Sequence, residues 1–155
     1  MKKFLFSGMI LIFAISILSY EKSNGKGFVV WDGKKDDQIK FYLDLKVNSN
    51  NPDSAINLIE EMVAFIKDLE PNTIAYEYFI SNDKKSISLR EVYKNSDAAL
   101  THMNNFGEGP YADKFLDLMT INSFEVLGNA SEDLMKSVEA FTTDNRTLIS
   151  GFDRN

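Results

Sequence analysis

The sequence predicts an α+β domain whose strands and helices follow the order β-α-β-β-α-β. Four segments have the residue types of strands, at 38–47, 73–80, 87–93 and 121–127. Apolar residues recur at helical spacing between the first and second of these segments, and again between the third and fourth. This order is that of the ferredoxin-like sandwich, to which the chain adds a C-terminal helix and short strand.

The first half of the domain carries clear start and stop signals. Residues 38–47 alternate in part between apolar and polar side chains and predict a strand. Pro52 predicts the first turn of a helix, and Pro71 predicts its end. A polar turn at 81–86 then joins the second and third strands into a hairpin. The apolar face predicted for the helix consists of Ile56, Ile59, Met62, Val63, Ile66 and Leu69.

The second half contains two short helices before the fourth strand. Asn95 or Ser96 is expected to cap the first of them. Gly107 and Gly109 are expected to break the chain, after which Pro110 begins the second helix.

The predicted sheet has helices on one face only, so its other face needs a cover. The C-terminal extension, 129–155, is expected to form a helix from Ser131 through Phe141 and a short strand at 147–152. It is too short to cover a sheet face alone. We therefore expect a homodimer in which two sheets pack together, a dimeric α/β barrel.

The N-terminus has the layout of a secretory signal. Lys2 and Lys3 precede an uncharged apolar run at 4–20. We expect residues 1–19 to be a cleaved signal peptide and 20–37 a linker, which predicts an exported protein, periplasmic or extracellular. The alternative is an uncleaved membrane anchor, because the run approaches the length that spans a bilayer. Contact with a membrane is expected only through this segment.

Composition excludes several classes of protein. The chain has 155 residues and 44% hydrophobic residues, enough for one packed domain. It has no Cys, which excludes disulfide scaffolds, thiolate metal sites and a cysteine nucleophile. Its single His, His102, excludes a multi-histidine metal centre. The net charge of −6 argues against binding nucleic acid.

Residues 38–128 resemble the antibiotic biosynthesis monooxygenase family, including its quinol monooxygenases. The hairpin that pairs YEYFIS with LREVYKNSDAALTHM is the most telling part of the resemblance. The matching stretches are IKFYLDLKV (39–47), AINLIEEMVAFIKDLEPNTIAYEYFIS (55–81), ISLREVYKNSDAALTHMNN (87–105), YADKFLDLM (111–119) and INSFEVLG (121–128).

The resemblance implies a dimeric barrel and, as in the oxygenase members, oxidation of phenolic or quinol substrates by dioxygen without metal or flavin. Such a reaction needs an apolar pocket, a base and the exclusion of water, and it needs no cofactor. Haem-degrading relatives use an Asn in the first strand and a His in the later helix. This chain offers Asp44 and Leu45 in the strand and no His in 111–119, so haem chemistry is not expected.

Glu91 is the first candidate catalytic residue. If Ile80 pairs with Ile87, then Tyr78 lies beside Leu89, Tyr76 beside Glu91 and Ile74 beside Tyr93, all on one face. Burial there would raise the pKa of Glu91 toward the range useful to a general base. The alternative is a structural carboxylate that accepts a hydrogen bond from a tyrosine. On the other face, the same register predicts an ion pair between Glu77 and Arg90.

His102 is the second candidate, because it matches a His in the AL-x-H signature of the family. It is expected either to face the cavity and hydrogen-bond a substrate hydroxyl, or simply to pack between helices. The residues predicted to bind a flat aromatic substrate, with core packing as the alternative, are Tyr76, Tyr78, Tyr93, Asn105, Phe106 and Tyr111.

Three functions therefore compete. The first is an exported, cofactor-independent monooxygenase that oxidises a quinol or similar hydroxyarene. The second is a non-catalytic exported dimer that binds a small apolar ligand. The third is a membrane-tethered interaction protein whose barrel only dimerises.

Overall fold

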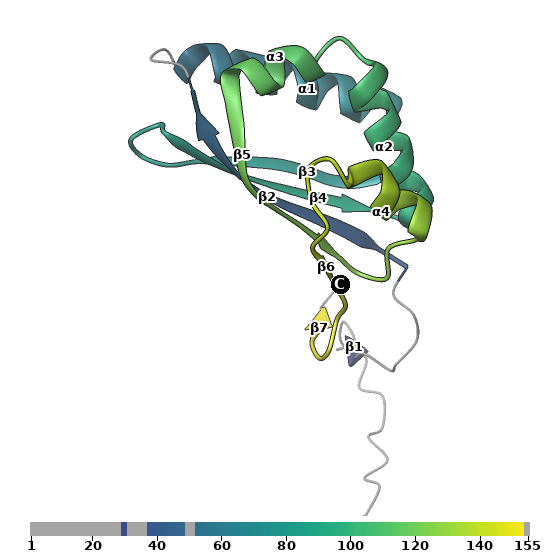
Figure 1. Cartoon of the computed structure of the whole chain (residues 1–155). Coiled ribbons are helices and arrows are strands. Elements are labelled where there is room, and N and C mark those ends of the chain that lie inside the picture. The colour runs from purple at the N-terminus through teal and green to yellow at the C-terminus, as the bar shows by residue number, and fades with distance from the viewer. Residues whose placement is uncertain (1–28, 31–36, 49–51, 154–155) are drawn as a thin grey trace, which may run out of the picture.

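The computed structural model describes residues 29–30, 37–48 and 52–153. Its main sheet has the strand order β3-β4-β2-β5-β6 (Figure 1). Neighbouring strands are antiparallel except β5 and β6, which are parallel. The strands are β2 (Ile39–Val47), β3 (Thr73–Ile80), β4 (Ser86–Tyr93), β5 (Met119–Leu127) and β6 (Asn145–Arg146). The predicted α+β, ferredoxin-like fold is thereby confirmed, while the dimeric barrel stays a prediction.

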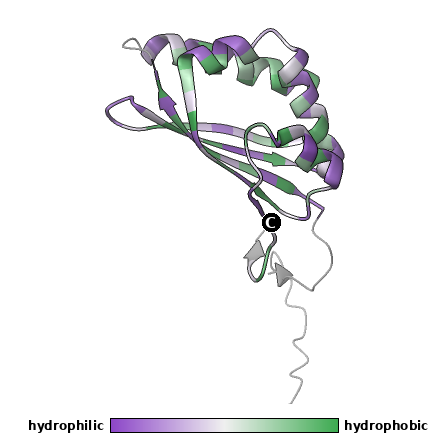
Figure 2. Cartoon of the chain, viewed as in Figure 1, coloured by the Kyte–Doolittle hydropathy of each residue, from purple (hydrophilic) through white to green (hydrophobic). Residues whose placement is uncertain are grey.

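The helices lie on one face of this sheet (Figure 1). Hydrophobic and hydrophilic residues alternate along them, as is typical of amphipathic helices (Figure 2). They are α1 (Pro52–Leu69), α2 (Ser96–Glu108), α3 (Ala112–Leu118) and α4 (Glu132–Val138). The side chain of Asn95 caps α2 by accepting a hydrogen bond from the backbone N–H of Ala98. The core therefore lies between these helices and the inner face of the sheet.

The hairpin register places the candidate base as predicted. Ile80 pairs with Ile87, Tyr78 with Leu89 and Tyr76 with Glu91. One prediction is wrong: Tyr93 lies opposite Thr73, because an irregularity between Thr73 and Ala75 shifts the register. Ile74 is consequently 56% exposed.

Several helix details also differ from the predictions. The buried face of α1 is rotated, with Ala55, Leu58, Met62 and Ile66 buried and Leu69 58% exposed. Gly107 does not break α2, which continues through it to Glu108. Pro110 and Tyr111 precede α3, which begins at Ala112. Helix periodicity alone locates an apolar stripe only to within about one residue position, and a single glycine such as Gly107 weakens a helix without necessarily ending it.

The C-terminal extension wraps the open edge of β5. α4 ends at Val138, earlier than predicted, and Leu134 and Val138 are fully buried. The predicted strand at 147–152 is wrong. Instead, β6 pairs with β5, and β7 (Phe152–Asp153) forms a separate antiparallel pair with β1 (Val29–Val30). Gly128 permits the turn out of β5, since its φ of 121° is one that L side chains rarely adopt.

The predicted signal or anchor at 1–19 lies outside the described residues, as does most of the predicted linker. Within the part of the chain that the structure describes, no helix has the length and apolar character needed to cross a bilayer.

Candidate functional site

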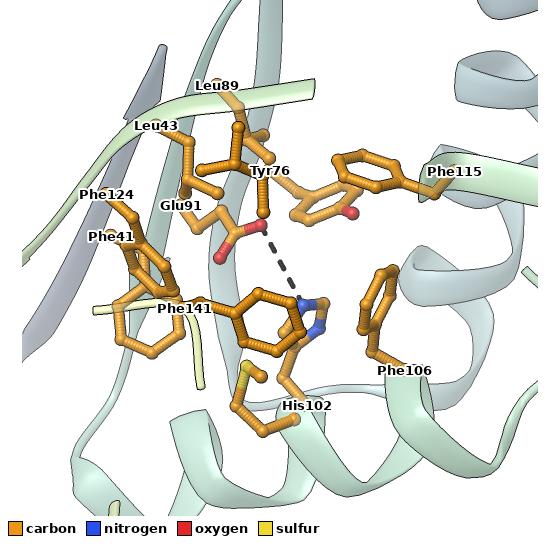
Figure 3. Close-up of a pocket in the computed structure, with 12 residues that line it drawn as sticks. Phe41, Leu43, Tyr76, Leu89, Glu91, His102, Phe106, Phe115, Phe124 and Phe141 are labelled. Carbon is orange, nitrogen blue, oxygen red and sulfur yellow. Dashed lines mark ion pairs between the residues drawn. The ribbon is translucent and has the colours of Figure 1, made fainter. Parts of the chain in front are cut away.

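A small cavity lies between the inner face of the sheet and α2 and α3. About 40 Å³ of it can hold the centre of a water molecule. Its walls are almost entirely apolar, and the polar side chains among them are Tyr76, Glu91 and His102 (Figure 3). The lining residues are Phe41, Leu43, Tyr76, Leu89, Glu91, His102, Met103, Phe106, Phe115, Ile121, Phe124 and Phe141. An acid and a base thus face a space from which apolar side chains exclude most water.

Glu91 is buried on β4, and one of its carboxylate oxygens accepts a hydrogen bond from the protein itself. The Tyr93 hydroxyl donates a hydrogen bond of 2.6 Å to Glu91 Oε2. The other oxygen, Oε1, lies 3.8 Å from His102 Nε2, which is longer than a hydrogen bond (Figure 3). Glu91 and His102 therefore each direct an atom toward the other across a gap beside the cavity.

The opposite nitrogen of His102 is held by a second carboxylate. His102 Nδ1 lies 3.1 Å from Oε2 of Glu70, the residue that follows α1. The Asn105 side-chain amide donates to Glu70 Oε1 at 3.0 Å, and the Thr73 hydroxyl donates to Glu70 Oε2 at 2.8 Å. Because Glu70 is held in place as an acceptor, His102 carries a proton on Nδ1, the nitrogen that faces Glu70. This hydrogen bond fixes the orientation of the ring.

The three groups perturb one another electrostatically. Burial raises the pKa of Glu91, and although the charge of His102 and the Tyr93 hydrogen bond oppose this, the net direction is upward. Burial lowers the pKa of His102, but the charge of Glu91 and the hydrogen bond and charge of Glu70 outweigh it and raise the pKa. For Glu70, burial raises the pKa, but the His102, Asn105 and Thr73 contacts more than offset it, so the pKa is lowered.

These directions define the charge state of the site. Glu70 is ionised and His102 is more readily protonated than a free histidine. Glu91 holds a proton more readily than an ordinary carboxyl. Raised pKa values of this kind at Glu91 and His102 suit proton exchange between the protein and a bound molecule near neutral pH.

Tyrosines surround this centre as neutral groups. The hydroxyls of Tyr76 and Tyr78 lie 2.9 Å apart, and their rings meet edge to face. The Tyr76 and Tyr93 rings both pack against the His102 ring, with centroids 5.6 and 5.3 Å away. Burial raises the pKa of Tyr76 and of Tyr93 well above the ordinary value, so both stay protonated.

The predicted substrate-binding residues divide into two groups. Tyr76 and Phe106 line the cavity. Tyr93 instead supports Glu91, and Tyr78 supports Tyr76. Asn105 and Tyr111 line a smaller cavity of about 10 Å³ behind His102, together with Met62, Phe65, Ile66, His102 and Phe106.

Sequence reasoning missed two contributors. Glu70 is 5% exposed and holds His102, yet it lies 32 positions away along the chain, beside a helix-ending proline. Phe141 belongs to the extension, which was not expected to contribute to the site. Both reach the site through tertiary packing, for which a single sequence gives no spacing signal. Within residues 29–30, 37–48 and 52–153, no group of three or more acidic or histidine side chains is placed to hold a metal ion.

Known structures share this fold. MupZ from Pseudomonas fluorescens matches with a TM-score of 0.67 and 19% identity, over 81% of this chain and 96% of that protein. SnoaB, a cofactor-independent oxygenase from Streptomyces nogalater, matches with a TM-score of 0.53 and 18% identity, over 61% and 95%. A conserved protein of unknown function from Bacteroides thetaiotaomicron matches with a TM-score of 0.53 and 21% identity, over 61% and 99%.

The fold that the resemblance predicted is confirmed by the matches with MupZ and SnoaB. A candidate antibiotic biosynthesis monooxygenase from Caulobacter crescentus matches more weakly, with a TM-score of 0.46 and 22% identity over 62% of this chain and 92% of that protein. The 81% of this chain that matches MupZ is more than residues 38–128 supply, so that likeness extends into the flanking segments. No sequence-family model and no curated protein matches the chain.

Proposed function

We propose that this protein is a cofactor-independent monooxygenase that oxidises a quinol or similar hydroxyarene with dioxygen. The observation that carries the proposal is the gap of 3.8 Å between Glu91 Oε1 and His102 Nε2, which opens beside an aromatic-lined cavity. A substrate hydroxyl in the cavity beside these two atoms can reach both of them, and it then meets an acceptor in Glu91 and a donor in protonated His102. The fold that the chain shares with SnoaB, itself a cofactor-independent oxygenase, is consistent with this function.

The protein's part in the reaction is to remove a proton and stabilise the resulting anion. Glu91 Oε1 accepts the proton of the substrate hydroxyl, and its raised pKa makes it a stronger base than an ordinary carboxylate. The protonated His102 donates from Nε2 to the oxyanion, because Glu70 holds its Nδ1 proton. Tyr93 keeps the reacting carboxylate in place.

The chemistry that follows belongs to the substrate and dioxygen. The electron-rich anion passes one electron to dioxygen, which gives an organic radical and superoxide. These two combine to form a carbon–oxygen bond at a ring carbon that bears a hydrogen, and the peroxide anion takes back the proton held by Glu91. The resulting hydroperoxide loses water to leave a carbonyl group. One atom of dioxygen thus enters the product and the other leaves as water. The apolar walls prevent bulk water from protonating the anion first.

The test measures oxygen uptake with purified protein and 1,4-naphthohydroquinone. The wild-type protein should accelerate uptake above the spontaneous rate, and Glu91→Gln should lower the accelerated rate by about 100-fold or more, since it removes the base. Glu77→Gln, which changes an exposed glutamate on the neighbouring strand, is the matched control and should leave the rate unchanged. Ligand-dependent thermal stabilisation without accelerated uptake would favour a non-catalytic module that binds a small apolar ligand.

We also propose that the protein acts as an exported homodimer. The outer face of the sheet supports this proposal, because Tyr42 and Phe79 are exposed there beside the Glu77–Arg90 ion pair. Two such faces would bury aromatic side chains while retaining paired charges at the rim. Export rests on the predicted signal at 1–19 alone.

A further inference from the structure

The C-terminal extension supplies one wall of the cavity through Phe141. Among the twelve residues that line this cavity, Phe141 is the one that lies outside a helix or strand, in the turn after α4. It is also the one in contact with solvent over a large part of its surface, with an exposed fraction of 38%. Figure 3 shows its ring extending into the group of side chains around Glu91 and His102. Phe141 therefore stands where the cavity meets solvent.

The backbone on both sides of Phe141 is held in place. Before it, Leu134 and Val138 anchor α4 in the core. After it, the Thr142 hydroxyl donates 2.6 Å to the carbonyl oxygen of Phe124, itself a lining residue. The backbone N–H of Val126 then donates to the carbonyl oxygen of Asp144. With the chain fixed on either side, rotation of the Phe141 side chain is the motion that opens the cavity at least cost.

The size of the cavity requires such a motion. Its volume of about 40 Å³ is far less than a fused aromatic ring system needs. The other aromatic walls, such as Phe41, Phe115 and Phe124, are buried within strands or helices and cannot turn outward without disturbing the core. Tyr76, Met103, Phe106 and Ile121 are partly exposed but lie within strands or helices, so the exposed Phe141 side chain, which lies in a turn, marks the easiest point of entry for a ring-sized ligand.

We propose that Phe141 is the gate of the cavity and selects substrates by the number of fused rings. Its ring turns outward to admit a flat hydroxyarene of one or two rings, then packs against the ligand edge to face. The ligand hydroxyl points toward Glu91 and His102. The inference about turnover rests on the proposed function, whereas the inference about binding does not.

The experiment follows ligand fluorescence at neutral pH with two probes, 1-naphthol with two fused rings and 9-phenanthrol with three. The wild-type protein should bind 1-naphthol more tightly. Phe141→Ala should improve the affinity for 9-phenanthrol relative to 1-naphthol by about tenfold and speed the dissociation of 1-naphthol. Phe141→Trp should shift the affinity ratio in the opposite direction, and this variant retains an aromatic ring if the alanine variant folds poorly.

Ile149→Ala is the control, because Ile149 lies in the same extension with 91% exposure and lines neither cavity described above. It should bind both probes as the wild type does. An unchanged affinity ratio in both Phe141 variants would overturn the proposal, as would the absence of binding by either probe in every variant. Binding that changes as expected, with no accelerated oxygen uptake, would support the gate and contradict only the monooxygenase function.

Discussion

Two glutamates on the same hairpin occupy opposite environments. Glu91 faces the core, where burial raises its pKa and Tyr93 and His102 are its neighbours. Glu77 lies on the outer face, exposed to solvent and paired with Arg90. The two residues lie on adjacent, paired strands at neighbouring positions of the register. Their side chains point to opposite faces because successive side chains along a strand alternate. The face of the sheet, rather than the residue type, thus decides whether a carboxylate here is buried with a raised pKa or exposed and paired with a cation.

The largest expected effect on stability comes from removing Glu70, the buried carboxylate that holds His102 on the inner face of the sheet. Glu70→Ala should lower the free energy of unfolding by about 3–5 kcal/mol, because it leaves Nδ1 of the buried His102 ring without its hydrogen-bonded carboxylate. It also removes the acceptor for the Asn105 amide and the Thr73 hydroxyl. Urea unfolding followed by circular dichroism measures the change.

Glu77→Ala is the matched change on the outer face. It should cost about 0.5 kcal/mol or less, because the Glu77–Arg90 pair is exposed and screened by solvent. Similar losses of stability in the two variants would show that the buried cluster contributes no more than a surface ion pair. The two faces would then differ in the burial of their carboxylates but not in how much those carboxylates contribute to stability.

Much of this contrast could be predicted from the sequence, because it depends on strand periodicity and hairpin register. Those two features placed Glu91 inward beside Tyr76 and paired Glu77 with Arg90 outward, and both placements are confirmed. The predicted pairing of Ile74 with Tyr93 was wrong, because an irregularity between Thr73 and Ala75 shifts the register. No residue type in that stretch indicates such an irregularity.

The parts of the site that could not be predicted come from packing between elements distant in sequence. Glu70 meets His102 only because the end of α1 lies against α2, and helix periodicity does not specify that approach. Phe141 reaches the cavity because α4 ends at Val138, three residues earlier than the predicted end of that helix. Local patterns determine the faces of elements, whereas the contacts across the site depend on how the finished elements pack.

A smaller effect should follow from Tyr93→Phe, which removes the hydroxyl that donates to Glu91 Oε2. That hydrogen bond stabilises the ionised carboxylate and lowers its pKa, so its loss should raise the pKa of Glu91 further. Carbon-13 NMR titration of labelled glutamate side chains measures the shift. Tyr42→Phe, on the exposed outer face, should leave the titration of Glu91 unchanged. A lower pKa for Glu91 in Tyr93→Phe would contradict the assigned donor and acceptor.

The smallest effect concerns how stability depends on pH, and it comes from Glu91 and His102 together. In the wild-type protein burial raises the pKa of Glu91, and the charge of Glu91 with the hydrogen bond and charge of Glu70 outweigh burial and raise the pKa of His102. A histidine whose folded pKa is raised stabilises the protein fully below its unfolded value of about 6.5. Stability should therefore fall as the pH rises from about 6.5 through the folded pKa. Urea unfolding at several pH values between about 5.5 and 8.5 measures this decline.

The double variant Glu91→Gln with His102→Gln supplies the comparison, since it has no group of this cluster that titrates in the same range. Glu70 has a lowered pKa, so its own contribution to stability is lost only as the pH falls below its unfolded value of about 4.5, outside the window. The double variant should thus show a flatter profile than the wild type. If both profiles have the same slope, His102 is not charged against Glu70 in the folded protein. The donor that the proposed reaction requires at Nε2 would then be absent, and the inner face would differ from the outer face in burial but not in chemistry.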